Sequence, residues 1–179
     1  MGKIFVTSDI WLNRPMGKYM ELDSNEYNDI IIKNWNSTVG NKDDVYILGG
    51  IGISDMYQIF IKLNGKIHIL DNYVTEDERY FVDVLKKSIQ LSVDKKLKKR
   101  ITFEPSQIIA IPEEDVILSY LPLLDWYGKE TGTFCFHGHW SFSDLSEHRI
   151  SCKSEEWDYK PISIKEIKKN MDIFQEKIL

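Results

Sequence analysis

Cysteine and long apolar runs are scarce in this sequence of 179 residues. Its two cysteines, Cys135 and Cys152, fall in apolar, strand-like segments, so we expect buried thiols and no disulfide framework. No apolar run approaches the roughly 20 residues that cross a bilayer, and the first residues do not resemble a signal peptide. Internal repeats and low-complexity segments are also lacking. We therefore expect one domain over residues 1–179, located in the cytoplasm.

Positive charge is in the minority, because the net charge is −5. This balance argues against general nucleic-acid binding, and the hydrophobic content of 42% is typical of a globular protein. One basic run, Lys95–Arg100, stands out. We interpret it as a solvated face, since a nucleic-acid patch would need interleaved aromatic residues. We expect neither a membrane nor a nucleic-acid partner, and the oligomeric state stays open.

Strand and helix patterns alternate in the first half of the chain. Short apolar segments predict strands, and two helices begin with predicted capping boxes, Asp23 with Glu26 and Thr75 with Glu78. A β-α-β-α-β-α order predicts a parallel sheet with right-handed crossovers. The predicted strands cover 3–7, 44–48 and 66–70, and the predicted helices cover 23–39, about 55–63 and 75–90.

The second half has mainly strand patterns and ends in a helix. Pro161 precedes this helix, and Ser163 with Glu166 predicts its capping box. The predicted strands cover 107–111, 115–120, 133–137 and 149–152, and the predicted apolar stripe of the last helix is Ile164, Ile167, Met171 and Phe174.

Candidate site residues follow several of these strands. Asp9 comes just after the first strand, where open α/β sheets place their sites, although it could simply cap a turn. Gly49–Gly52 could cradle a phosphate but matches no phosphate-loop fingerprint. His137 and His139 end a later strand, where imidazoles commonly reach a metal or a phosphate. Backbone hydrogen bonds could equally satisfy both rings.

The order of these motifs resembles that of the calcineurin-like metallophosphoesterases, especially their small bacterial and phage members. Ser8-Asp9 is similar to the opening Asp-x-His motif of the family. Gly49-Gly50 stands where the family has Gly-Asp, and Asp71-Asn72-Tyr73-Val74 stands where it has Gly-Asn-His-Asp. The segment 118–123 resembles Leu-Ser-His-Tyr-Pro-Leu, and 137–141 resembles His-Gly-His-x-His.

This resemblance covers nearly the whole chain, and it implies both a fold and a chemistry. The implied fold class is α/β, a four-layer α/β/β/α sandwich of the metallophosphoesterase type, with the site on loops at strand ends. In the family, two divalent metals share a bridging Asp, and a metal-bound hydroxide attacks phosphorus.

The sequence departs from the family at most of the metal-ligand positions. Family histidines are replaced by Trp11, Tyr73 and Tyr120, and the bridging Asp is replaced by Gly50. Only Asp9, Asn72 and His139 remain of the family's ligands, and neither an indole nor a phenol is a useful ligand at neutral pH. We therefore expect no metal, no other cofactor and no catalytic residue.

The replacements point to binding instead. Aromatic faces stack on bases, and Arg14, where many relatives have another His, offers a planar fork for phosphate. We expect an inactive protein that binds and sequesters a phosphorylated, nucleotide-like molecule without cleaving it. The expected ligand-binding residues are Asp9, Trp11, Arg14, Gly50, Asn72, Tyr73, Tyr120, His137 and His139.

Three alternatives remain open. The new rings could fill the emptied cleft and pack as core. The chain could be a protein-interaction scaffold, with Trp126-Tyr127 and Trp140 with Phe142 as the candidate contact residues. It could also be a residual phosphoesterase that uses His139 and Asp9 as acid and base.

Overall fold

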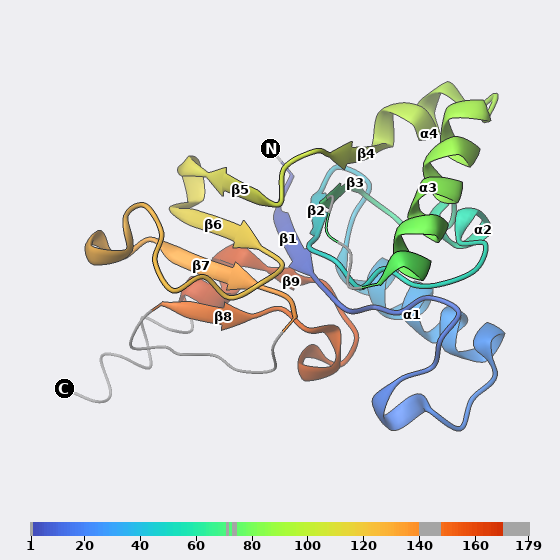
Figure 1. The fold of residues 1–179 in the computed structure, drawn as a ribbon, viewed down its shortest axis with the longest axis horizontal. Coiled ribbons are helices and arrows are strands. Elements are labelled where there is room, and N and C mark those ends of the chain that lie inside the picture. The colour runs from blue at the N-terminus through green and yellow to red at the C-terminus, as the bar shows by residue number, and fades with distance from the viewer. Residues whose placement is uncertain (1, 71, 73–74, 140–147, 170–179) are drawn as a thin grey trace.

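The computed structural model describes residues 2–70, 72, 75–139 and 148–169, which form two β-sheets and a set of helices (Figure 1). The first sheet has the order β4-β3-β2-β1-β9. Strands β1 to β4 are mutually parallel and β9 is antiparallel to β1, so the predicted parallel order is confirmed. These strands are β1 (Ile4–Thr7), β2 (Asp44–Ile47), β3 (Lys66–Leu70), β4 (Ile101–Glu104) and β9 (Ile162–Ser163).

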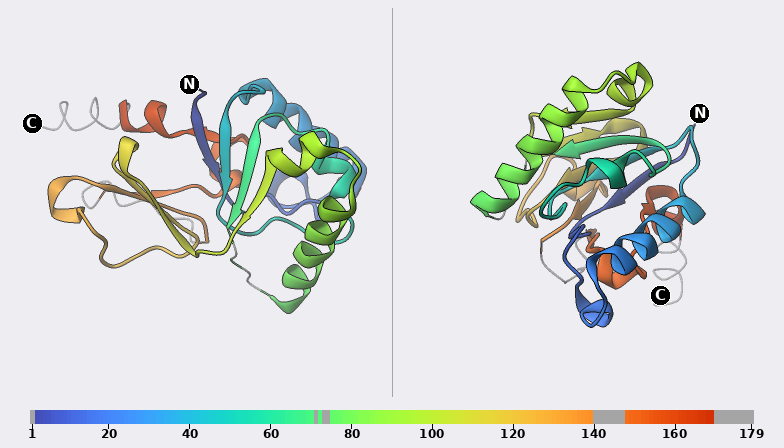
Figure 2. Two further views of the ribbon diagram at one scale, coloured as in Figure 1. Left: turned by 90° about the horizontal axis from the view of Figure 1, so that it is seen from above. Right: turned by 90° about the vertical axis from the view of Figure 1, so that its right-hand side faces the viewer.

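Four helices cover one face of this sheet and lie on the side that faces the viewer in the right-hand view of Figure 2. Each helix buries one apolar side against the strands: Trp35, Phe60, Leu85 and Leu97 pack in the same core as Val45. This helix layer therefore leaves the opposite face of the sheet for the second half of the chain. The helices are α1 (Ser24–Thr38), α2 (Tyr57–Phe60), α3 (Glu76–Leu91) and α4 (Lys95–Arg100).

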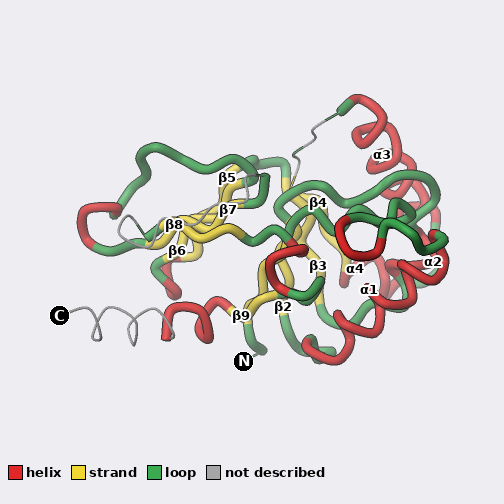
Figure 3. The backbone as a smooth tube through the Cα atoms, turned by 90° about the horizontal axis from the view of Figure 1, so that it is seen from below, coloured by secondary structure: helices red, strands yellow, loops and turns green. Residues whose placement is uncertain are grey.

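The second sheet has the order β5-β6-β7-β8 and lies against the first (Figure 3). Val6 and Leu70 from the first sheet share a core with Leu118 and Phe136 from the second. Its strands are β5 (Ile108–Ile111), β6 (Val116–Ser119), β7 (Phe134–His137) and β8 (Arg149–Ser151), and the 3₁₀ turns are Gly17–Tyr19, Pro112–Glu114, Lys129–Thr131 and Ser154–Trp157.

The predicted element boundaries are mostly confirmed, with particular exceptions. The capping box of Asp23 and Glu26 is present. Of the box predicted at Thr75, one half is present, because the Thr75 side chain accepts from Glu78 N. The Glu78 side chain instead accepts from Ile51 N. Helix α2 is shorter than predicted. Strands β4 and β9 were not predicted. The basic run forms α4 with its lysines exposed, as expected of a solvated face.

Both cysteines are buried and free, as predicted. Burial raises the pKa of the Cys135 thiol. Residues 164–169 are helical, and Ile164 and Ile167 belong to the core between the sheets; Met171 and Phe174 lie outside the described residues. Within the described ranges, no helix is long and apolar enough to cross a membrane.

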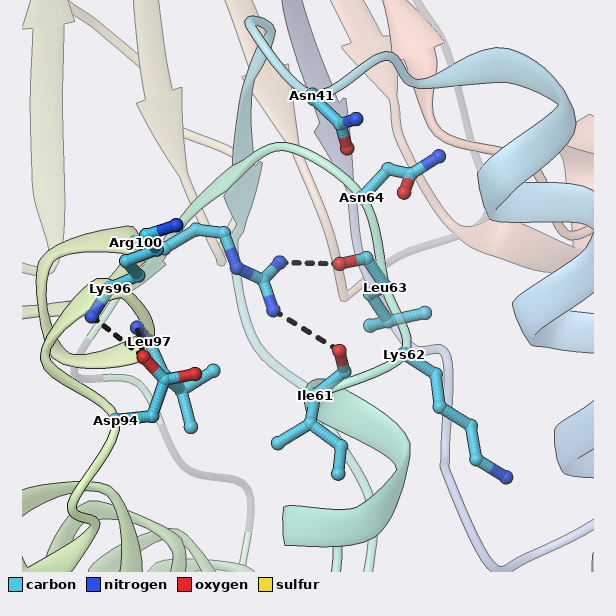
Figure 4. Close-up of a pocket in the computed structure, with 9 residues that line it drawn as sticks. All are labelled: Asn41, Ile61, Lys62, Leu63, Asn64, Asp94, Lys96, Leu97 and Arg100. Carbon is cyan, nitrogen blue, oxygen red and sulfur yellow. Dashed lines mark hydrogen bonds between the residues drawn. The ribbon is translucent and has the colours of Figure 1, made fainter.

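A hollow of about 250 Å³ beside α4 is organised by Arg100 (Figure 4). Its guanidinium donates to the carbonyl oxygens of Phe60 and Gly65, each at 3.1 Å, and to that of Leu63. These carbonyls lie at or beyond the end of α2, where backbone acceptors lack helical partners. Arg100 therefore ties α4 to α2 and is a structural residue.

Candidate functional site

The candidate site forms where the loops after β1 and β2 meet. Asp9 N donates to Gly49 O at 2.9 Å, and Ser8 Oγ donates to the same oxygen at 3.3 Å. Asp9 and Trp11 have φ values of 52° and 43°, an unusual backbone region for residues with side chains. Such strained residues persist only where surrounding contacts hold them, so this loop is held in a specific shape.

The hydroxyl of Tyr120 joins this loop to the second sheet. It donates to Asp9 Oδ1 at 2.9 Å and lies 3.2 Å from His139 Nδ1. A hydroxyl has one proton to donate, so when that proton goes to Asp9, His139 Nδ1–H must donate to the Tyr120 oxygen. The backbone supports the arrangement, because His139 N donates to Tyr120 O at 2.8 Å.

The Tyr120 ring lies between two glycine-containing loops, one from each sheet. A Cβ at Gly49 would lie 2.6 Å from its Cδ2, and a Cβ at Gly138 would lie 2.7 Å from the same atom. Any other residue at either position would displace the ring. Tyr120 is consequently only 4% exposed, and its burial, with Asp9 beside it, raises the pKa of its phenol.

The Asp9 carboxyl has unusual electrostatics. Burial raises its pKa from 3.8 to about 7; the hydrogen bond from Tyr120 and the charge of Lys153 oppose this rise, and the nearby Glu78 adds to it. Glu78 is fully buried and accepts from Ile51 N at 3.1 Å. Sequence reasoning assigned Glu78 only to a capping box and so missed this second acid beneath the glycine-rich loop.

The other expected ligand-binding residues are dispersed. Asn72 is buried, and its amide donates to Leu48 O at 3.1 Å and Gln107 O at 3.3 Å. His137 is completely buried in β7. Gly50 has a φ of 65° and adjoins Asp9. Tyr73 lies outside the described residues. Asn72 and His137 are therefore placed in the interior rather than at an open surface.

Trp11 and Arg14 form a pair beside the glycine-rich loop. Arg14 is exposed and Trp11 is half-buried, with the guanidinium carbon 5.4 Å from the centre of the indole ring. Trp11 N donates to Gly50 O at 3.0 Å, which fixes the pair next to Asp9. A cation over an aromatic face is thus available at the rim of the site.

The donor set does not fit a two-cation centre. Among the residues with described positions, no group of three His, Cys, Asp or Glu side chains could hold a metal ion. Asp9 and His139 both contact the Tyr120 hydroxyl, and the Asn72 amide faces backbone carbonyls. The three retained ligand positions therefore serve hydrogen bonds within the protein.

The candidate contact pair Trp126-Tyr127 divides into two roles. Trp126 is 8% exposed, packs against Ile117 and Cys135 of the second sheet, and donates from Nε1 to Thr133 O at 2.8 Å. It is therefore a core residue on the outer face of that sheet. Tyr127, at 93% exposed, is the member of the pair that remains accessible to a partner. Trp140 and Phe142 lie outside the described residues.

Comparison with known proteins bears on the fold alone. No family model matches the sequence, and no curated protein matches it. The chain is similar to a solved structure described as the protein of unknown function AQ665 from Aquifex aeolicus, with a TM-score of 0.60 and 20% identity. The match covers 94% of this chain and 99% of that one. The two chains thus share a mixed α/β fold along nearly their full lengths.

The raised pKa of Asp9 predicts a pH-dependent stability. Because the folded pKa of about 7 lies above the ordinary carboxyl pKa of 3.8, the folded state binds more protons between these values, and the free energy of unfolding falls as the pH rises through this window. Asp9→Asn removes the titration. The free energy of unfolding of this variant, minus that of the native chain, should rise by on the order of 4 kcal/mol from about pH 4 to pH 8. Urea unfolding at each pH measures this difference. If the free energies of unfolding of the two proteins changed with pH in parallel, the raised pKa of Asp9 would be contradicted.

The Tyr120 hydroxyl should stabilise the fold through Asp9. We expect Tyr120→Phe to lower the free energy of unfolding by roughly 1–3 kcal/mol, since a buried carboxyl loses its donor. The loss should be larger near pH 8 than near pH 5, because the lost bond favours the ionised carboxylate. Tyr127→Phe is the matched control at an exposed ring and should change stability by less than about 0.5 kcal/mol. Equal effects of the two substitutions would argue against the bridge.

Proposed function

We propose that this chain is a catalytically inactive metallophosphoesterase-fold protein that binds, without cleaving, a phosphorylated, nucleotide-like small molecule. The observation that carries the proposal is the Tyr120 hydroxyl, which holds Asp9 at 2.9 Å and His139 at 3.2 Å. A phenol at this point uses the two side chains that the family resemblance assigns to cations. Asp9 and His139 are thereby engaged in hydrogen bonds within the protein, and we call Asp9, Tyr120 and His139 the floor of the site.

We infer that the fold is the four-layer α/β/β/α sandwich of that family. Three successive layers support this: the helices α1–α4, the five-stranded sheet and the four-stranded sheet. The order of the family-like motifs along the chain also supports it. Over the outer face of the second sheet, the described cover is the segment around Trp126, which packs on Ile117 and Cys135.

Loss of hydrolysis follows from the donors at the site. Two-metal phosphoester cleavage needs hard, ionised ligands that clamp the attacking and leaving oxygens. Asp9, with a pKa of about 7, is partly protonated at neutral pH, and the Asn72 amide is directed at Leu48 and Gln107 carbonyls. These features support a binding protein rather than a hydrolase.

We assign ligand binding to three side chains at or beside this floor, namely Trp11, Arg14 and His139. Arg14 is exposed and stacked over Trp11, so its guanidinium can turn to a phosphate while the indole offers a face to a base. His139 is half-buried beside Tyr120 and adds an imidazole at the opposite loop. Together these side chains offer a guanidinium for a phosphate, an indole face for a base and an imidazole.

Titration calorimetry with mono-, di- and cyclic nucleotides tests the proposal. We expect saturable heat with at least one nucleotide at one ligand per chain, and no product in the same sample by chromatography. Arg14→Ala should weaken binding by about tenfold, through loss of a charge-assisted phosphate contact. Arg79→Ala, at an exposed arginine on α3, is the matched control and should bind normally.

Mass spectrometry of molecules released by heating the purified protein provides an independent readout. A phosphorylated compound in the released fraction would support the proposal without any guess at its identity. Absence of heat with every nucleotide, together with no released compound, would contradict it.

A further inference from the structure

A strongly basic surface surrounds α4 in this acidic chain. Residues 86–103 hold seven of the 23 lysine and arginine residues and one of the 28 acidic residues, although the net charge of the chain is −5. We call the C-terminal half of α3, the turn 92–94 and α4 the lysine corner. In Figure 1, this turn lies at an outer corner of the molecule, remote from the four-stranded sheet.

The lysines of this corner are available to a partner. All six are exposed, and none makes an ion pair with another residue in the described part of the chain. The single acid, Asp94, accepts from Lys96 N and Leu97 N as the cap of α4. The six are Lys86, Lys87, Lys95, Lys96, Lys98 and Lys99.

Two aliphatic side chains project from the same corner. Leu91 is 83% exposed and Val93 is 98% exposed, and Lys87 lies one helical turn before Leu91. The core face of α3 is formed by Val82, Leu85 and Ile89, on the opposite side of the helix. Leu91 and Val93 therefore contribute nothing to the core, and water must order around both.

We propose that the lysine corner is a docking surface for an anionic lipid bilayer. Lysines near a membrane are attracted by the negative surface potential of anionic lipids, and exposed aliphatic side chains between them can enter the interface. Leu91 and Val93 insert at the apex, while the lysines of α4 and the end of α3 contact the headgroups.

A nucleic acid would be the other polyanion, and the side chains favour it less. Binding of single strands relies on aromatic and arginine faces that stack on bases. The only arginine here, Arg100, donates to backbone carbonyls, and the neighbouring ring, Phe103, lies half-buried with the Lys86 ammonium 5.6 Å from its centre. Exposed aliphatic residues would have no role in such a complex.

This proposal revises the expectation that the chain has no membrane partner. That expectation depended on the lack of a segment long enough to cross a bilayer. Contact with a surface depends instead on which side chains the fold brings together, and the turn between α3 and α4 brings six lysines and two aliphatic residues to one corner. The surface is also independent of the site at Asp9.

Vesicle co-sedimentation of the full chain tests the proposal. We expect binding to phosphatidylcholine vesicles that contain about one phosphatidylserine in three lipids, and little binding to pure phosphatidylcholine. Raising the salt from about 0.1 M to about 0.5 M should release the protein. Lys95→Glu with Lys99→Glu should weaken binding by about tenfold or more, and Leu91→Ser with Val93→Ser by several-fold.

A matched control reverses the same number of charges elsewhere. Lys33 and Lys42 are exposed outside the corner, and Lys33→Glu with Lys42→Glu should leave vesicle binding within about twofold of the native chain. Equal losses in the two charge-reversal variants would overturn the proposal, as would equal binding to both kinds of vesicle. Tighter binding to a single-stranded oligonucleotide, unaffected by the Leu91 and Val93 changes, would overturn it in favour of a nucleic acid.

Discussion

The hydrogen bonds of one tyrosine hydroxyl join the two sheets at the candidate site. Tyr120 follows β6 of the second sheet, and Asp9 follows β1 of the first, so their 2.9 Å contact joins the two sheets where their loops meet. His139, at 3.2 Å, extends the same arrangement to the loop after β7. This hydroxyl therefore contacts side chains from both sheets at one point.

The backbone of the surrounding loops has to accommodate that ring. Gly49 and Gly138 allow it to approach to distances that a Cβ would prevent, and the buried carboxylate of Glu78 holds the glycine-rich loop through Ile51 N. The Tyr120 ring fills the space between these loops, and no metal-ligating cluster surrounds Asp9 among the residues with described positions. Burial then raises the pKa of Asp9 to about 7.

Local patterns made much of the fold predictable. The parallel order of β1 to β3 followed from apolar runs alternating with helical stripes, and the Asp23 cap followed from its spacing to Glu26. Strand β4 was missed because its four residues, Ile101–Glu104, directly follow a basic helix and show no separate apolar run. The two-residue β9 is defined only by its partner β1.

The site was less predictable, for physical reasons. The sequence placed Asp9, Tyr120 and His139 at strand ends, and their convergence agrees with that expectation. It could not show that Asn72 and His137 lie in the interior, since burial depends on packing between the sheets. The alternative in which new rings fill the cleft describes Tyr120 well, whereas Trp11 and Arg14 remain at the rim.

Titration of the purified chain with Mn²⁺ or Zn²⁺, followed by crystallography at saturating metal, tests whether the Tyr120 hydroxyl excludes a cation from Asp9. We expect no stoichiometric metal at near-neutral pH and an intact contact between the Tyr120 hydroxyl and Asp9. A pair of ions bound between Asp9 and His139, with the tyrosine displaced, would contradict it.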